Sequence, residues 1–165
     1  MLGAAAPTAT KDTMPHHDDP RESDEGLTPS SPSARYQTLR RWTLSTADGI
    51  RTVRQQLRAE LGLGDSPSGT LGTVPERMIL VASELAANAI EHGRPPTIVT
   101  LGRDGSRYLL EVADHDPYSV PVLAGHRAPG AGGFGLQIAR RVGQDVGWYT
   151  TGTTKHIWVT FSPHD

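Results

Sequence analysis

The chain has 165 residues, with 16 basic and 18 acidic side chains, a formal net charge of -2 and no cysteine. This length is enough for one domain with a real core, and the balanced charge gives no bulk attraction to nucleic acid or to an anionic membrane. The lack of cysteine excludes disulfides, thiolate zinc sites and a cysteine nucleophile. The apolar runs are far shorter than the roughly 20 residues of a membrane span, and no signal-peptide pattern opens the chain, so we expect a cytoplasmic protein.

The first 35 residues differ in composition from the rest. They are rich in proline, carry more acidic than basic side chains and contain no aromatic residue. Such a segment buries too little apolar surface to offset the entropy that is lost on ordering. The sequence therefore predicts a disordered tail over residues 1–35 and one globular domain over residues 36–165.

The apolar periodicity of this domain indicates an order of helices and strands. The expected helices cover residues 45–62, residues 75–92 and a segment that starts at Phe134. Ser45 or Thr46 can cap the first helix, and Gly62 can end it. The expected strands cover residues 40–44, 97–101, 107–114, 146–151 and 155–162. Helices followed by paired strands predict a two-layer α/β sandwich with one mixed, mostly antiparallel sheet and helices on one face.

Two polar side chains interrupt the apolar second helix. Glu84 and Asn88 lie one turn apart in SELAANAIEHG, residues 83–93, beside the apolar stripe of the helix. In one interpretation they are ordinary polar groups, with Asn88 bonded to a loop and Glu84 paired with an arginine. In the other, Asn88 offers its carbonyl oxygen to a hard cation such as Mg²⁺, and Glu84 orients a nucleophile or accepts its proton. Both interpretations stay open for this helix alone.

A glycine-rich loop leads into the third helix. GHRAPGAGGFGLQIARR, residues 125–141, contains Gly130, Gly132, Gly133 and Gly135. Glycines let backbone N–H groups approach a phosphate, and a helix N-terminus adds unpaired donors. GAGGFG also fits a dinucleotide fingerprint, but a long loop precedes it where a strand is required, and the chain has no Walker A motif. A generic phosphate loop and a flexible surface loop are the remaining interpretations.

Asp114 ends a strand directly before the long loop, where its carboxylate can accept a hydrogen bond from a ligand amine or form a turn. The three elements, E-L-x-x-N-x-x-x-H on a helix, a strand-end Asp and G-x-G-L opening a helix, resemble the GHKL ATPase superfamily. The similarity is greatest to stand-alone anti-sigma-factor serine/threonine kinase-like proteins of actinobacteria. It spans about residues 40–161.

The resemblance implies a Bergerat-type α/β sandwich that binds ATP and Mg²⁺. Asn88 would bind the Mg²⁺ that bridges the phosphates, Glu84 would be the general base toward a serine hydroxyl of a partner protein, and Asp114 would accept from the adenine amino group. The resemblance also assigns lid, phosphate or pocket contacts to His92, Gly130, Gly132, Gly133, Phe134, Gly135, Leu136 and Thr154. The implied partners are a sigma factor and an anti-sigma-factor antagonist, and such relatives commonly form homodimers.

The chain departs from the family pattern in two places. The usual D-x-G-x-G is replaced by Asp114-His115-Asp116-Pro117, which adds a charge and removes a backbone donor. Where relatives often read G-K-T-x-W, His156 takes the place of the threonine, so Thr154 would have to substitute by a local shift. A non-catalytic partner-binding module of the same fold is therefore the second hypothesis. A histidine-kinase catalytic domain is the third, although residues 1–35 are too short and proline-rich to form its dimerisation unit.

Overall fold

The structure of the protein, a computed structural model, describes residues 26–64, 72–121 and 134–163. Its helices and strands are, in chain order, β1 (Gln37–Leu44), α1 (Asp48–Glu60), α2 (Val74–His92), β2 (Thr97–Asp104), β3 (Arg107–Asp114), α3 (Phe134–Val142), β4 (Asp145–Thr150) and β5 (Lys155–Phe161). No helix in these described ranges is both long and apolar enough to cross a membrane.

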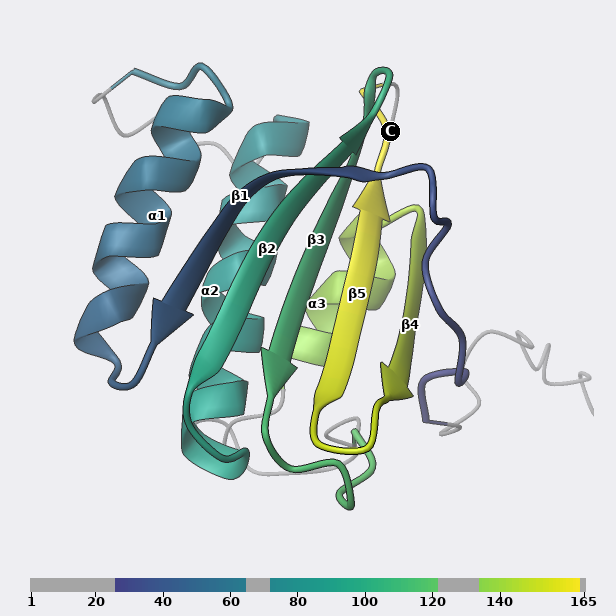
Figure 1. Ribbon diagram of the computed structural model, residues 1–165. Coiled ribbons are helices and arrows are strands. Elements are labelled where there is room, and N and C mark those ends of the chain that lie inside the picture. Colours follow the sequence, from purple (N-terminus) through teal and green to yellow (C-terminus); the bar gives the residue numbers. More distant parts are fainter. Residues whose placement is uncertain (1–25, 65–71, 122–133, 164–165) are drawn as a thin grey trace, which may run out of the picture.

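The strands form one five-stranded sheet in the order β1-β2-β3-β5-β4. Helices α1, α2 and α3 all cover the same face of this sheet, and no helix of the described residues covers the opposite face (Figure 1). The predicted two-layer sandwich is confirmed, with one correction to the sheet. Every strand pairing among the described residues is antiparallel, and the parallel contact is confined to an isolated bridge between Pro29 and Trp148. Tight turns account for two of these pairings, β2 with β3 and β4 with β5, because a short connection makes the next strand run in the opposite direction. In the other two pairings the connection is long: α1 and α2 lie between β1 and β2 in the sequence, and α3 and β4 lie between β3 and β5.

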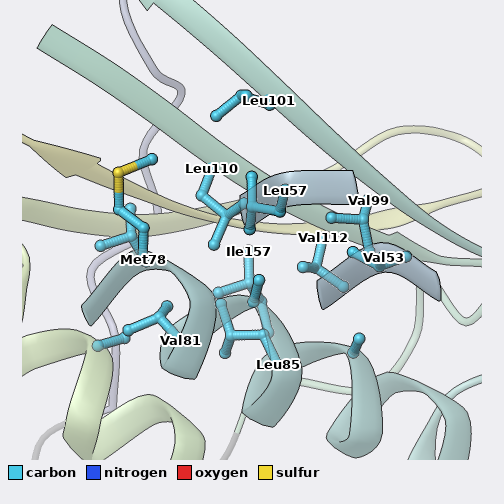
Figure 2. Packing of buried hydrophobic residues seen from close by; sticks show 14 of the residues in the cluster. Val53, Leu57, Met78, Val81, Leu85, Val99, Leu101, Leu110, Val112 and Ile157 are labelled. Carbon is cyan, nitrogen blue, oxygen red and sulfur yellow. The ribbon is translucent and has the colours of Figure 1, made fainter. Parts of the chain in front are cut away.

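The core lies between the helices and the inner face of the sheet. Figure 2 shows side chains from α1 and α2 packed against those of the central strands. The participants include Val53, Leu57, Met78, Val81, Leu85, Val99, Leu101, Leu110, Val112, Ile157 and Val159. Because strand side chains alternate between faces, the inward residues of β5 are those at odd positions, and this alternation also fixes the direction of Lys155.

Helix α2 carries the polar pair and has strong signals at both ends. Thr73 caps it through a capping box: its hydroxyl accepts from the Glu76 backbone N–H at 3.4 Å, and the Glu76 carboxylate accepts from the Thr73 backbone N–H at 3.2 Å. Pro75 occupies the first turn, where its missing N–H has no helical partner. The helix ends at Gly93, as predicted.

Helix α1 starts later than predicted. The residue before its first turn is Ala47, which makes no side-chain cap, so neither Ser45 nor Thr46 caps this helix. The chain instead turns tightly out of β1, and Gly49 N–H donates to the Thr46 carbonyl at 3.1 Å. At the other end, Gly62 has a φ of 72°, the left-handed conformation that glycine supplies after a helix.

The segment before β1 packs on the sheet. Leu27 is buried, with 6% of its surface exposed, and its carbonyl accepts from the Trp148 indole N–H at 2.8 Å. The Ser30 carbonyl accepts from the Trp158 indole N–H at 2.6 Å. Residues 26–35 thus run beside the edge strand β4 (Figure 1), and the packed part of the chain extends beyond the expected boundary at residue 36. Composition did not reveal this, because two tryptophans far away in the sequence supply the binding surface.

Candidate functional site

A cavity of about 250 Å³ lies between the C-terminal half of α2, the end of β3 and the start of β5. Its wall includes Asn88, His92, Asp114, Ser119 and Lys155. This volume is smaller than the roughly 300–1,000 Å³ of pockets that enclose whole ligands. Polar groups from three elements surround this cavity, which makes it the candidate site, although it is too small to enclose a whole ligand of that size by itself.

The structure brings together three residues that the sequence predicted separately. Asn88 and His92 lie one turn apart on α2, and Asp114 reaches the same cavity from the end of β3. Asn88 is partly exposed, and its amide has no hydrogen-bond partner among residues 26–64, 72–121 and 134–163. An amide without partners at the wall of a cavity is free to offer its oxygen to a ligand or a cation.

Glu84 lies one turn before Asn88 on the same face of α2 and is also partly exposed. Within the described part of the chain its carboxylate forms neither a hydrogen bond nor an ion pair. The arginine pairing considered for this residue is therefore not present in these ranges. Glu84 does not line the cavity. It lies next to Asn88, so α2 carries a carboxylate and a carboxamide on the same face.

The first turn of α3 packs against Glu84. A Cβ atom on Gly135 would lie 3.0 Å from Glu84 Cβ and 3.2 Å from the Glu84 carbonyl oxygen. Glycine therefore allows α3 to approach α2 this closely, and a larger residue would need a small shift of Glu84 or of the helix. This contact is a role for Gly135 in addition to the lid role that the resemblance implies. Leu136 is 1% exposed and belongs to the core, whereas the preceding Phe134 is 42% exposed. The predicted contacts of Gly130, Gly132 and Gly133 lie outside the described residues.

Asp114 is almost completely buried and has two partners. Its Oδ1 accepts from the Asp116 backbone N–H at 2.8 Å, and its Oδ2 lies 3.2 Å from Lys155 Nζ. The Lys155 ammonium also donates to Ser119 Oγ at 2.6 Å. Ser119 in turn bonds the Asp116 carboxylate, and this hydrogen bond is the main reason that the pKa of Asp116 lies below its usual range.

The ion pair of Lys155 was not foreseen from the sequence, although a signal was present. Lys155 has the same parity as Ile157 and Val159, two apolar residues of β5 that enter the core. A lysine with inward parity must point into a cavity or toward a buried acid. The antiparallel register of β3 and β5 then places Lys155 directly opposite Asp114.

His156 lies on the opposite face of the sheet from the cavity. Its Nδ1 is 3.0 Å from Glu111 Oε1, and its Nε2 is 2.7 Å from Thr154 Oγ1. Tyr149 stacks on the imidazole with ring centroids 4.4 Å apart and donates its hydroxyl to Glu111 at 2.9 Å. Thr154 therefore belongs to this outer network and does not line the cavity. The β5 residue that faces the cavity is Lys155.

The close approach of α2 to Asp114 depends on Gly93. A Cβ atom at residue 93 would lie 2.5 Å from Asp114 Cγ and 2.6 Å from the Ala89 carbonyl oxygen. No side chain can occupy this space without movement of α2 or β3. Because Gly93 has no side chain, the end of α2 can approach the end of β3 this closely.

Comparison with known proteins identifies the class of this fold and site. Residues 43–161 match the family described as the histidine kinase-like ATPase domain. The match covers more than half of the chain, so the protein belongs to this family, which lies in the GHKL superfamily. No curated protein matches the chain.

ATPase domains of this superfamily bind ATP with Mg²⁺, and Asn88 is the residue of the cavity wall whose chemistry fits the metal ion. Among the described residues there is no group of three or more histidine, aspartate or glutamate side chains placed to hold a metal. One protein oxygen, that of Asn88, is nevertheless enough where phosphates and water complete the shell, as is usual for Mg²⁺. The Asp114 carboxylate, which the resemblance assigns to the adenine base, is already in contact with the Lys155 ammonium. A nucleobase amino group would have to share the carboxylate with Lys155.

Proposed function

We propose that the protein is an ATP-dependent serine/threonine protein kinase of the anti-sigma-factor type. The observation that carries this proposal is the arrangement on α2. Glu84 and Asn88 share one face, both are partly exposed, and neither side chain has a partner among the described residues. A carboxylate and a carboxamide that have no protein partner and are open on one side are both available to a ligand that enters beside α2.

The proposed roles follow from the chemistry of each group. ATP would supply the phosphoryl group, and Mg²⁺ would neutralise charge on its phosphates. The Asn88 carbonyl oxygen would hold the metal ion. Glu84 would accept the proton of a serine hydroxyl on the partner protein while the serine oxygen bonds to the γ-phosphorus and the bond from that phosphorus to ADP breaks. The residues of this chain thus position the reactants and receive one proton.

The proposed substrate is a serine of an anti-sigma-factor antagonist, and the second proposed partner is a sigma factor. Support for both comes from the E-L-x-x-N-x-x-x-H motif on α2 together with membership of the histidine kinase-like ATPase family. A cytoplasmic location and a homodimer are proposed on the same grounds.

A second candidate function is a module of this fold that regulates a partner by binding alone. The ion pair between Asp114 and Lys155 at 3.2 Å favours it, because the acid that would recognise the base is already neutralised. In this alternative the open face of α2 contributes to a protein contact, and no phosphoryl group is transferred.

Two substitutions on one helix separate these candidates. Calorimetry with Mg²⁺ and ATP should show binding by the wild type that is lost in Asn88→Ala. Glu84→Gln should retain binding but lose phosphoryl transfer to the partner by at least about a hundredfold. Glu91→Gln is the matched control, because the same chemical change falls on α2 at a side chain that is 64% exposed. Absence of ATP binding by the folded wild type would reject the kinase and leave the binding module.

A further inference from the structure

The wall of the cavity contains a buried cation, Lys155, beside Asp114. The Lys155 side chain is 9% exposed, that of Asp114 is 4% exposed, and their Nζ and Oδ2 atoms lie 3.2 Å apart. The ammonium is held on a second side by Ser119 Oγ at 2.6 Å. Burial of one of these charges without the other would be strongly unfavourable, because neither reaches enough water. The two residues therefore behave as a unit.

The fold leaves Lys155 little freedom to turn away from this position. It is the first residue of β5, opposite Asp114 on one side and Thr150 on the other. The side chains of its neighbours on the same face continue into the core, and Ser119 covers its outer end. The Lys155 ammonium is thus a fixed part of the cavity wall and differs from the ammonium of a mobile surface lysine.

This arrangement changes what Asp114 offers to a ligand. One oxygen accepts from the Asp116 backbone N–H at 2.8 Å, and the other faces an ammonium. A ligand amino group presents hydrogen atoms with partial positive charge, so it would be attracted by the carboxylate and repelled by the adjacent cation. Its hydrogen bond would also replace or weaken an ion pair that already stabilises both charges.

Building on the proposed nucleotide site, we propose that Lys155 is an affinity-determining residue that weakens the binding of adenine nucleotides in this cavity. Its ion pair with Asp114 occupies the position at which the carboxylate would recognise the base amino group. A nucleotide binds fully only when the pair separates or shares the carboxylate. The natural chain therefore binds ATP weakly, and the strength of that binding is set by Lys155.

Replacement of the cation tests this directly. In Lys155→Thr the Asp114 carboxylate loses its charged partner in the free protein and regains a partner when a base amino group binds. We therefore expect the Kd for Mg²⁺ and ATP, measured by calorimetry, to fall at least about tenfold, which corresponds to about 1.4 kcal/mol. Lys155→Arg is the matched control, because it retains a cation opposite Asp114 and should stay within about threefold of the wild type.

Lys155→Met provides a second route if the threonine variant fails to fold. It preserves most of the apolar stem and removes the ammonium, with its charge and its hydrogen bond to Ser119, so it should tighten ATP binding as Lys155→Thr does. Thermal unfolding and near-UV circular dichroism establish that each variant is folded before titration. An unchanged or weaker affinity in both neutral variants would overturn the inference, since it would mean that the ammonium assists the ligand or does not contact it.

NMR of the wild-type protein tests directly whether ATP disturbs the ion pair of Lys155. The sequence contains only two lysines, Lys11 and Lys155, so selective ¹⁵N-lysine labelling gives two ammonium signals. The Lys155→Thr spectrum assigns them by the loss of one. Saturating ATP should shift the Lys155 signal, because its partner is shared or lost. A signal that remains unchanged while calorimetry reports saturation contradicts the inference.

The outcomes separate this inference from the proposed kinase. Wild-type binding that depends on Asn88 but is not improved by Lys155→Thr rejects the role of Lys155 and leaves the nucleotide site. Tight binding by Lys155→Thr with none by the wild type supports the role of Lys155 and favours the non-catalytic module for the natural chain. If no folded variant binds ATP, the inference and the kinase are both rejected.

Discussion

Gly93, the residue that ends α2, lies so close to Asp114 at the end of β3 that a Cβ atom on it would be 2.5 Å from the Asp114 Cγ atom. This contact joins the helix that carries Asn88 to the strand that carries the buried acid. The backbone of Gly93 has a φ of -93°, which any residue can adopt, so the glycine is needed for space alone. The geometry of the cavity therefore depends on a glycine at position 93, because any side chain there would push α2 away from β3.

Gly93→Ala should displace the end of α2 from β3. We expect a loss of about 1–3 kcal/mol in the free energy of unfolding, as for other overpacked positions, together with weaker ATP binding. Denaturant unfolding and calorimetry measure the two effects. Gly152→Ala is the control, because a Cβ atom at that position would meet nothing within 4 Å. Equal stability of the two variants would show that the helix end tolerates the added methyl group.

Leu27→Ala tests the packing of the segment that precedes β1. Leu27 is 6% exposed and its carbonyl is bonded to Trp148, so we expect the free energy of unfolding to fall by about 2 kcal/mol, the low end for a buried leucine. Leu39→Ala, at a side chain that is 47% exposed, should change stability by less than about 0.5 kcal/mol. Urea unfolding followed by tryptophan fluorescence reports both, and a neutral Leu27→Ala would mean that this segment adds no stability.

Local signals predicted the second helix well. The proline in the first turn and Gly93 after the last turn act within a few residues of the helix end, so the sequence alone reveals them. The start of α1 was predicted wrongly because Ser45 and Thr46 have the chemistry of capping residues, whereas the chain is still leaving β1 there. At Ala47 the turn from the strand determines where the helix begins, and no local pattern records that turn.

The site was predictable only where one element supplied it. Glu84 and Asn88 are four residues apart on one helix, so helical periodicity places them on one face. The pairing of Lys155 with Asp114 depends on the register between β3 and β5, which are far apart in the sequence. The same register separates His156, on the outer face, from the cavity. Parity within β5 gives the direction of each side chain, but only the sheet gives its partner.

Thr97 is a buried threonine whose hydroxyl has no hydrogen-bond partner among the described residues. It is 1% exposed, at the start of β2. Thr97→Val replaces the hydroxyl by a methyl group of similar size and retains the β-branch that suits a strand. We expect the free energy of unfolding to rise by about 1 kcal/mol, because the cost of burying an unpaired hydroxyl is removed.

Differential scanning calorimetry should report this gain as a rise in Tm of about 3 °C. Thr43→Val is the control for β-propensity, since Thr43 is an exposed residue of the neighbouring strand β1. A fall in the Tm of Thr97→Val, with no change in Thr43→Val, would contradict the prediction, because it would show that the hydroxyl is hydrogen-bonded in the folded protein.

Tyr149 makes the outer face of the sheet sensitive to alkaline pH. Burial and the adjacent Glu111 carboxylate raise the pKa of its phenol well above the usual value of 10.0. The folded protein therefore holds the proton more tightly than the unfolded chain does. This contribution to stability is complete below the pKa of the unfolded phenol and is lost as the pH rises from there toward the folded pKa.

We therefore expect the free energy of unfolding to decline above about pH 10, where unfolded tyrosine loses its proton, and the decline to be shallower in Tyr149→Phe. Urea unfolding at a series of pH values between neutral and strongly alkaline measures the slopes. Tyr118→Phe is the matched control, because Tyr118 is 86% exposed and its loss should leave the slope of the wild type. Equal slopes in all three proteins would contradict the prediction, because they would show that folding does not raise the pKa of the Tyr149 phenol.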